Sequence, residues 1–265
     1  MGKAPFKVGL LISTYNWPAA LDLIFKSIRM QSYLPDEILI ADDGSGVETQ
    51  QLIRLHQQTS RIPIKHAWHE DEGFRKSLIL NKAIKQAEAD YIIEIDGDIL
   101  LHRHFIADHI RHAQRGIFIQ GARAMVNEAR TKALLHGASK QPSFYSNGIS
   151  NRFNAFRLPI FSSIFPSNPG SSNNIKGCNI AFWREDFIAI NGYNNTFFGW
   201  GSEDNEFAAR LINAGIAKKR LKFAAICFHL HHPLNAQDQS AVNRSRYQYT
   251  MINKVVSCEN GYAEV

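Results

Sequence analysis

The amino-acid sequence predicts an α/β protein with a mostly parallel central sheet flanked by helices. Three observations support this fold class: strands and helices alternate over the first 100 residues, the strands are apolar on both faces, and acidic turns follow two of them. Alternating strands and helices form right-handed βαβ units, which place the strands parallel in one sheet. Helices cover both faces of such a sheet, so its strands are expected to be continuous apolar runs.

Residues 1–100 contain the regular part of this pattern. The expected strands cover residues 8–13, 37–41, 62–66 and 91–95. The first helix begins at Pro18, which suits a first helical position, and apolar residues at helical spacing follow it. Two further helices are expected, one through Leu52 and Leu55 and one over residues 74–88.

The second half of the sequence is less regular. Residues 137–175 are rich in Ser, Asn, Pro and Gly, which predicts a long irregular region. Regular structure is expected again as a strand over residues 180–183, a short helix from Arg184, a helix over residues 206–214 and a strand over residues 223–228. The longer of these helices would end at Gly215, since glycine often closes a helix.

The composition and its charge pattern exclude several classes of protein. Of the 265 residues, 45% are hydrophobic and 20% are charged, which is typical of a globular domain and not of a disordered chain, a collagen or a coiled coil. The net charge is +6, but residues 101–175 alone carry 9 basic and 2 acidic side chains. Because the basic excess is confined to this segment, we expect no nucleic-acid partner.

The cysteines and the N-terminus indicate a compartment. The three cysteines form no CxxC pair, which suits a reducing environment. The apolar run VGLLI near the N-terminus is too short for a signal peptide, and no later run reaches the length of a membrane span. These features predict a soluble cytoplasmic protein.

Two acidic turns follow predicted strands and would lie at the same edge of the sheet. Asp96 and Asp98 flank a glycine after one strand, and Asp42 and Asp43 follow another. Ligands of parallel sheets bind at the carboxyl ends of the strands, where an Asp-x-Asp pair can hold a divalent cation that bridges phosphate oxygens. The Asp42–Asp43 turn either caps the next helix or binds a base or ribose. Since the chain contains neither GxGxxG nor GxxxxGK[ST], a nucleotide would be held in some other way.

Two motifs in the second half carry further candidate residues. Trp200 lies between two glycines and precedes Glu203 and Asp204 at a helix start. Acidic residues there complement the helix dipole, but an indole between glycines suits a platform for a sugar ring, with an acid beside it as general base. Residues 229–232 contain three histidines after a strand, and one of them is a candidate ligand for manganese or a similar ion.

Taken in order, these motifs resemble those of family 2 glycosyltransferases with the GT-A fold. The first set comprises STYN at residues 13–16, DDGS at 42–45, EGFR at 72–75 and DGD at 96–98. The second set comprises GCNIAF at residues 177–182 and GWGSED at 199–204. This second set is similar to the galactosyltransferase-like half of bacterial chondroitin-polymerase-type enzymes and animal β-1,4-galactosyltransferases.

The resemblance implies a domain plan and a fold. It implies a Rossmann-like nucleotide-diphospho-sugar transferase domain, with the following parts: a single catalytic domain over residues 1–235, its nucleotide-binding half over 1–100, its acceptor-binding half over 101–235, and a C-terminal extension over 236–265. The length leaves no room for the second transferase domain that a polymerase needs, so we expect an enzyme that makes single additions.

The resemblance also implies which residues bind a nucleotide-sugar, usually a UDP-sugar. These residues all lie in the first half of the chain: Thr14, Asn16, Asp42, Asp43, Arg75, Asn81 and Asp96. Asp42 or Asp43 would contact the uridine, in a pocket lined by Thr14 and Asn16. Asp96 would face the ribose or the sugar.

A divalent metal ion, Mn²⁺ or Mg²⁺, is the cofactor that the resemblance implies. Asp98 would bind this ion, and His229 best matches the metal-binding histidine of the family. His231 is the alternative, because three histidines within four residues make the alignment ambiguous.

The catalytic and acceptor-binding residues would come from the GWGSED motif. Asp204 matches the catalytic base, with Glu203 beside it, while Trp200 and Gly201 would lie at the acceptor. Asp204 would take the proton from an acceptor hydroxyl as that oxygen attacks the anomeric carbon. One base and no second nucleophile predict inversion at that carbon.

The resemblance therefore implies transfer of a hexosyl or N-acetylhexosaminyl group to a glycan or a lipid-linked glycan. Two alternatives on the same fold stay open: a sugar-phosphate nucleotidyltransferase, and a non-catalytic module that binds nucleotides or glycans. The first alternative usually needs a glycine-rich signature with Arg or Lys, which residues 13–18 lack. Metal-dependent hydrolysis of a UDP-sugar would exclude the second.

The basic segment suggests how an acceptor is held. In this fold, residues 101–175 lead toward the acceptor side, so their basic side chains would bind an anionic or membrane-borne acceptor. A membrane-borne acceptor would bring the protein to the inner face of the membrane. The candidates are Arg123, Arg130, Lys132, Arg152 and Arg157. The alternative is a solvated basic face without a ligand.

Overall fold

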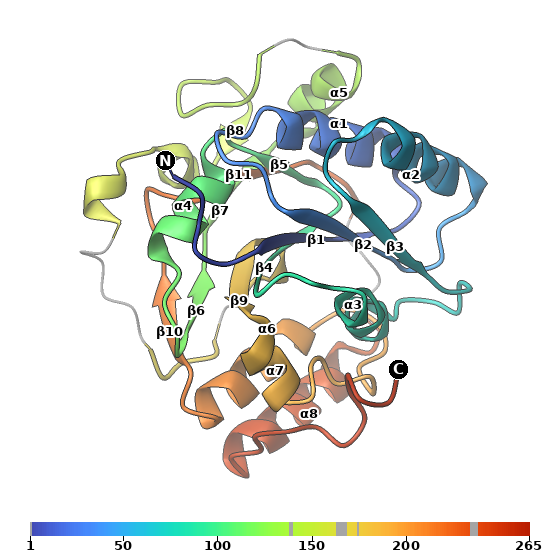
Figure 1. Cartoon of the computed structure of the whole chain (residues 1–265), viewed down its shortest axis with the longest axis vertical. Coiled ribbons are helices and arrows are strands. Elements are labelled where there is room, and N and C mark those ends of the chain that lie inside the picture. The colour runs from blue at the N-terminus through green and yellow to red at the C-terminus, as the bar shows by residue number, and fades with distance from the viewer. Residues whose placement is uncertain (1, 138–139, 163–168, 174, 234–237) are drawn as a thin grey trace.

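The central sheet has seven strands in the order β10-β6-β9-β4-β1-β2-β3, in a computed structural model that describes residues 2–137, 140–162, 169–173, 175–233 and 238–265 (Figure 1). Its strands are β1 (Val8–Thr14), β2 (Glu37–Asp42), β3 (Ile64–Trp68), β4 (Tyr91–Asp96), β6 (Ile117–Gln120), β9 (Ile180–Trp183) and β10 (Ala217–Arg220). Only β9 runs antiparallel to its neighbours, β4 and β6. The expected α/β fold with a mostly parallel sheet is therefore confirmed.

Helices cover both faces of this sheet, as Figure 1 shows. The helices on one face are α1 (Pro18–Arg29), α2 (Val47–Thr59) and α4 (Phe105–His112), and those on the other are α3 (Lys76–Lys85), α6 (Arg184–Ala189) and α7 (Glu203–Asn213). Alternate residues of β1 divide between the two faces: Leu10 packs in the core beneath α1, and Leu11 in the core beneath α3. Burial on both sides explains the continuous apolar runs in the sequence.

A second, smaller sheet continues from the carboxyl end of β4. Its strands are β5 (Ile99–Leu101), β11 (Cys227–His229), β7 (Arg123–Val126) and β8 (Ile149–Ser150), hydrogen-bonded in that order. β5 follows β4 after only Gly97 and Asp98, so the Asp-x-Asp turn is the junction between the two sheets. Strand β11, which is antiparallel to β5, returns the chain to this junction at His229.

Several boundaries differ from the expected ones. The strand expected over residues 223–228 is confined to Cys227–His229, because Phe223 and Ala225 have φ angles of 59° and 49°, which no strand accommodates. The region expected to be irregular contains short helices: η1 (Arg152–Ala155) and η2 (Pro159–Phe161). Helix α5 (Glu128–Leu135) precedes it, and η3 (Gly177–Asn179) follows it.

The C-terminal residues pack against the α7 side of the sheet. Helix α8 (Ser240–Ile252) lies against α7, and Thr250 Oγ1 donates a hydrogen bond to Glu206 Oε1 over 3.1 Å. Beyond α8, Asn260 O accepts a hydrogen bond of 2.8 Å from the backbone N–H of Asn195. None of the helices in the described residues has the length and apolar character needed to span a bilayer.

Candidate active site

The Asp-x-Asp turn is held tightly against the end of β1. Asp96 Oδ1 accepts hydrogen bonds from Ser13 Oγ over 2.9 Å and from Lys76 Nζ over 2.7 Å. A Cβ atom at Gly97 would lie 2.8 Å from the backbone oxygen of Ser13, so only glycine fits between the two aspartates. Asp96 is the last residue of β4 in the central sheet, whereas Asp98 immediately precedes β5 of the second sheet.

Asp98 forms a cluster with two histidines at the end of β11. Asp98 Oδ2 lies 3.2 Å from His229 Nε2 and 3.0 Å from His232 Nε2, and one potential ligand atom from each of the three residues lies within 4.8 Å of the others. Two buried atoms of the cluster, Asp98 Oδ1 and His229 Nδ1, have no hydrogen-bond partner among the described residues. One carboxylate and two imidazoles fit the ligand preferences of Mn²⁺, so these residues suit a divalent metal ion.

The structure brings His232, not the alternative His231, to Asp98. The backbone N–H of His231 donates to Thr131 Oγ1 over 2.9 Å, and its imidazole is outside the cluster. The backbone N–H of Leu230 donates to the backbone oxygen of Asp98. This bond fixes the chain so that His229 and His232 face the Asp98 carboxylate. The sequence expectation for His229 and Asp98 fits this geometry, whereas His232 was missed because spacing alone does not tell which histidines turn inward.

Asp204 lies at the start of α7 with one carboxylate oxygen anchored and the other free of hydrogen bonds. Its Oδ2 accepts a hydrogen bond of 2.7 Å from the backbone N–H of Gly177, and its buried Oδ1 has no hydrogen-bond partner in the described part of the chain. A Cβ atom at Gly177 would collide with this carboxylate. The glycine of the GCNIAF motif therefore leaves the space that the Asp204 carboxylate occupies, and Oδ1 has no hydrogen-bond partner among the described residues.

Lys76, which belongs to none of the sequence motifs, connects the acidic groups. Its Nζ lies 2.7 Å from Asp96 Oδ1, 3.9 Å from Asp204 Oδ1 and 4.0 Å from Glu94 Oε1, and its side chain is buried. Burial alone would lower the pKa of Lys76, but the surrounding carboxylates raise it well above its usual value. Lys76 is therefore a permanent positive charge between Asp96 and Asp204.

Glu203, next to Asp204, has a different environment. Its Oε2 accepts a hydrogen bond of 2.9 Å from the backbone N–H of Gly201. Burial, together with the nearby charge of Asp204, raises the pKa of Glu203 to about 7, although Lys76 acts in the opposite direction. Glu203 thus supports the loop before α7, with a carboxyl that is partly protonated near neutral pH.

Trp200 is presented on a loop that is fixed from two sides. The flanking residues Gly199 and Gly201 have φ angles of +70° and +116°, which L side chains rarely adopt. The backbone N–H of Gly199 donates to Phe74 O over 3.0 Å, and Asn243 Nδ2 of α8 donates to Phe198 O over 2.9 Å. Because the indole is 42% exposed on this fixed loop, it is available to a planar ligand.

The structure buries Asp42, one of the two aspartates expected at the uridine, inside the protein. Asp42 is completely buried. Its Oδ1 accepts a hydrogen bond of 2.8 Å from the backbone N–H of Ser45, and its Oδ2 lies 3.0 Å from His66 Nε2. The bond to Ser45 closes the turn before α2, whose N-cap residue, Gly46, has no side-chain cap. Asp43 directly follows β2. Its Oδ1 lies 2.7 Å from His69 Nε2, and its Oδ2 accepts a hydrogen bond of 2.9 Å from the backbone N–H of Arg75.

The other residues expected at the nucleotide divide into two groups. Thr14 ends β1 and Asn16 follows it, on the same rim as Asp43. Asn16 Oδ1 accepts a hydrogen bond of 2.8 Å from the backbone N–H of Gly46. Arg75 donates to the backbone oxygen of Glu70 over 2.9 Å, which places its guanidinium beside the loop before α3. Thr14 and Asn16 are thus at the carboxyl end of β1, and Arg75 lies in the connection between β3 and α3.

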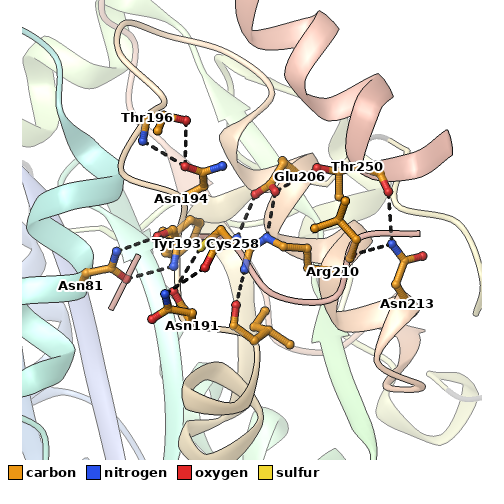
Figure 2. A network of polar contacts seen from close by, with 12 residues as sticks. Asn81, Asn191, Tyr193, Asn194, Thr196, Glu206, Arg210, Asn213, Thr250 and Cys258 are labelled. Carbon is orange, nitrogen blue, oxygen red and sulfur yellow. Dashed lines mark hydrogen bonds and ion pairs between the residues drawn. The ribbon is translucent and has the colours of Figure 1, made fainter. Parts of the chain in front are cut away.

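Asn81, in contrast, lies inside the protein. It is fully buried, and its amide donates to Tyr193 O over 2.7 Å and accepts from the backbone N–H of Tyr193 over 2.9 Å. Figure 2 shows that this amide belongs to a polar network with the buried Glu206–Arg210 ion pair of α7. The hydrogen bonds of the Asn81 amide hold α3 to the turn at Tyr193, so the structure gives this residue a structural role.

A mixed sheet with its acidic turns on one rim places the chain among GT-A glycosyltransferases, and solved structures support this. A mannosyltransferase from Pyrobaculum calidifontis, in complex with GDP-Man and Mn²⁺, matches 95% of this chain and 64% of its own with a TM-score of 0.61 and 17% identity. Staphylococcus aureus TarS 1–349, in complex with UDP-GlcNAc, matches 97% of this chain and 68% of its own with a TM-score of 0.62 and 14% identity.

Family comparisons define the group more closely. Residues 10–168 match glycosyl transferase family 2, and residues 163–233 match a family described as the N-terminal domain of galactosyltransferase. The chain belongs to glycosyltransferase family 2 and carries a galactosyltransferase-like segment in its second half.

Curated relatives are distant and longer. Validoxylamine A glucosyltransferase from Streptomyces hygroscopicus subsp. limoneus is 24% identical over 225 residues, which cover 79% of this chain and 48% of the relative. Chondroitin synthase from Escherichia coli is 22% identical over 244 residues, which cover 85% of this chain and 35% of the relative. The chain thus spans about half, or less, of the length of these relatives.

Proposed function

We propose that this chain transfers a sugar from a UDP-sugar to a hydroxyl group of a glycan or lipid-linked glycan, with inversion at the anomeric carbon and with a divalent metal ion as cofactor. The observation that carries the proposal is the unbonded Oδ1 of Asp204, which Lys76 connects to the Asp-x-Asp turn. A base and a candidate metal centre therefore lie on one rim of the sheet.

On the donor side, Asp98, His229 and His232 would hold Mn²⁺. When bound, such an ion stabilises the negative charge of a leaving diphosphate. The mannosyltransferase structure is a complex with GDP-Man and Mn²⁺, and the TarS structure is a complex with UDP-GlcNAc. These relatives support a metal-bound nucleotide-sugar, and we expect the sugar to be a hexose or an N-acetylhexosamine.

On the acceptor side, Asp204 is the general base. Its Oδ1 takes the proton of the acceptor hydroxyl while the acceptor oxygen forms a bond to the anomeric carbon and the bond to the diphosphate breaks. The hydrogen bond from Gly177 keeps the carboxylate oriented, and the Lys76 ammonium lies 3.9 Å from its Oδ1. Direct displacement by one base inverts the anomeric carbon. Trp200 would stack on the acceptor sugar and align it for attack.

The test is a panel of UDP-sugars with Mn²⁺, scored by the release of UDP. We expect metal-dependent release with at least one donor, and we expect Asp204→Asn to lower the turnover by about 10²-fold or more. Asp186→Asn is the matched control, because Asp186 also has an unbonded, buried carboxylate oxygen but lies on α6, which begins beside Asp90 at the opposite end of β4.

Binding measurements separate the proposal from its alternatives. Asp204→Asn should bind UDP and Mn²⁺ as the unmodified chain does. Loss of UDP binding in this variant would remove Asp204 from the role of base. Pyrophosphate release from a sugar phosphate and a nucleoside triphosphate would indicate a nucleotidyltransferase, and binding without turnover of any donor would indicate a non-catalytic module.

A further inference from the structure

Exposed apolar side chains gather on the segment that follows β7. Tyr145, Phe153 and Ile160 are 82%, 75% and 78% exposed, and two less exposed members complete what we call the apolar surface: Tyr145, Phe153, Leu158, Ile160 and Phe161. The ring of Phe144 contacts those of Tyr145 and Phe153 at centroid distances of 5.1 Å and 6.1 Å. Soluble proteins rarely expose such a group without a partner for it.

This segment is tied to the body of the protein. Arg152 donates a hydrogen bond of 2.6 Å to the backbone oxygen of Phe144, and the backbone N–H of Leu158 donates to Phe223 O over 2.9 Å. The ring of Phe156 contacts that of Phe223 edge to face at 5.8 Å. The apolar side chains are therefore held outward by a fixed backbone.

A cationic cavity adjoins the apolar surface. It has a volume of about 240 Å³, and its lining residues are Ser32, His104, Ala107, Asp108, Arg111 and Arg157. Ser162 Oγ lies 2.9 Å from His112 Nε2, so the end of the apolar segment touches α4, and in Figure 1 the yellow ribbon of this segment lies beside that helix.

The positive charges without a carboxylate partner in this region belong to α4 and to the residues that precede it. Arg157 forms two hydrogen bonds to the buried Asp108, so its charge is offset. In the residues that the structure describes, no carboxylate lies within ion-pair distance of Arg103 or Arg111. Arg111 lines the cavity, and Arg103 immediately precedes its lining residue His104 in the sequence.

The basic residues that the sequence suggested as acceptor contacts are engaged elsewhere. Their partners are Cys178 Sγ for Arg123, the backbone oxygen of Lys140 for Arg130, Glu128 for Lys132, the backbone oxygen of Phe144 for Arg152, and Asp108 for Arg157. All five contacts are made within the chain, although the Lys132–Glu128 ion pair and the Arg130 hydrogen bond are exposed. An anion is therefore better served by Arg103 and Arg111.

We propose that the apolar surface and the adjoining cationic cavity dock the protein on an anionic lipid bilayer. Protruding apolar side chains enter the headgroup boundary of a bilayer, and basic groups beside them pair with anionic lipid phosphates. The cavity would receive one headgroup phosphate between Arg111 and His104. The positive charge next to the apolar group selects an anionic bilayer over a neutral apolar partner.

The position of the surface suits a membrane-borne substrate. β8 pairs with β7, β7 pairs with β11, and β11 ends at His229 of the candidate metal centre. The apolar segment begins beside β8, the edge strand of this sheet. A bilayer at this edge would lie next to the acceptor half of the molecule. The docking proposal itself does not rest on the proposed transfer reaction.

The test is sedimentation of the full chain with vesicles of phosphatidylcholine, with and without phosphatidylglycerol, at physiological ionic strength. We expect binding to the anionic vesicles. Ile160→Ser with Phe161→Ser should weaken it by about tenfold or more, since each buried methylene adds to interfacial binding. Arg103→Gln with Arg111→Gln should weaken it by roughly tenfold, and high salt should act in the same direction.

Matched controls and a second readout keep the outcome clear. Ile252→Ser changes an equally exposed residue on α8, and Lys254→Gln removes a charge after that helix; both should bind vesicles as the unmodified chain does. Equal sedimentation with neutral and anionic vesicles, or unchanged binding by either double variant, would overturn the proposal. Release by millimolar inorganic phosphate with no effect of the apolar variant would instead identify a phosphate site. UDP release measured without lipid should not change in these variants, so failure of docking is distinct from failure of transfer.

Discussion

The proposed metal centre has either His232 or His231 as its second imidazole ligand, and the structure favours His232. His232 Nε2 lies 3.0 Å from Asp98 Oδ2, whereas the backbone of His231 bonds to Thr131. We expect His232→Ala to weaken Mn²⁺ binding by about tenfold or more, because a carboxylate and a single imidazole are left as protein ligands. His231→Ala is the matched control and should bind Mn²⁺ normally. Calorimetric titration with Mn²⁺ measures both, and an equal loss in the two variants would contradict the arrangement.

Individual site residues were predictable where a motif sits at the end of a strand or the start of a helix. Asp98, His229 and Asp204 have this kind of signal, and all three lie in the candidate site. Lys76 has no such signal in the sequence, because its contacts form only when α3 packs against β4 and α7. The sequence likewise does not show that the amide of Asn81 bonds to Tyr193, which follows 112 residues later.

At the scale of elements, Lys76 is the contact that joins α3 to β4 and α7. Its removal leaves Asp96 and Asp204 with an uncompensated negative charge at a largely buried position. We expect Lys76→Met to lower the free energy of unfolding by roughly 3 kcal/mol, as for other buried ion pairs that lose one partner. Chemical denaturation measures this change, and UDP release should fall with it because Asp204 loses its neighbouring charge.

Lys82→Met provides the comparison within the same helix. Lys82 lies on α3 without an ion-pair partner among the described residues, so its substitution should change the free energy of unfolding by less than about 0.5 kcal/mol. Lys76→Arg, which keeps the charge, should retain more stability than Lys76→Met. If Lys76→Met and Lys82→Met were equally stable, the lysine would not be balancing the carboxylates.

The elements themselves were predictable in proportion to their length. The strands and helices of the first 100 residues are long enough to show a period, and their observed bounds lie within a few residues of the expected ones. The second sheet consists of strands of two to four residues, such as Ile149–Ser150, which are too short for any period. The left-handed backbone at Phe223 and Ala225 is likewise not visible in an apolar run.

For the whole molecule, the alternation of strands and helices in the sequence predicted the fold class. It did not predict how the strands and loops come together to form the candidate site. β9 enters the sheet antiparallel between β4 and β6, and this insertion carries Gly177, just before the strand, toward Asp204. The chain between β6 and β9 contributes β7 and β8 of the second sheet and the apolar surface. Contacts between segments so far apart in the sequence depend on tertiary packing, so a one-dimensional pattern does not contain them.

A buried histidine makes the stability of the whole molecule depend on pH. His109 in α4 is fully buried, its Nε2 lies 2.9 Å from Asn179 Oδ1, and burial lowers its pKa to about 4. The unfolded chain binds a proton at this histidine below about pH 6.5, whereas the folded protein does so only near its lower pKa. The stability contributed by neutral His109 is therefore complete above pH 6.5 and is lost as the pH falls toward its folded pKa.

His109→Gln tests this dependence, because glutamine keeps a hydrogen-bonding amide but does not titrate. Between about pH 7.5 and pH 4.5, this variant should lose on the order of 2 kcal/mol less free energy of unfolding than the unmodified protein. Urea denaturation at a series of pH values measures the difference. His136→Gln, at an exposed position, should lose as much as the unmodified protein. Parallel pH profiles for His109→Gln and the unmodified chain would mean that His109 is accessible to protons in the folded state, which its complete burial opposes.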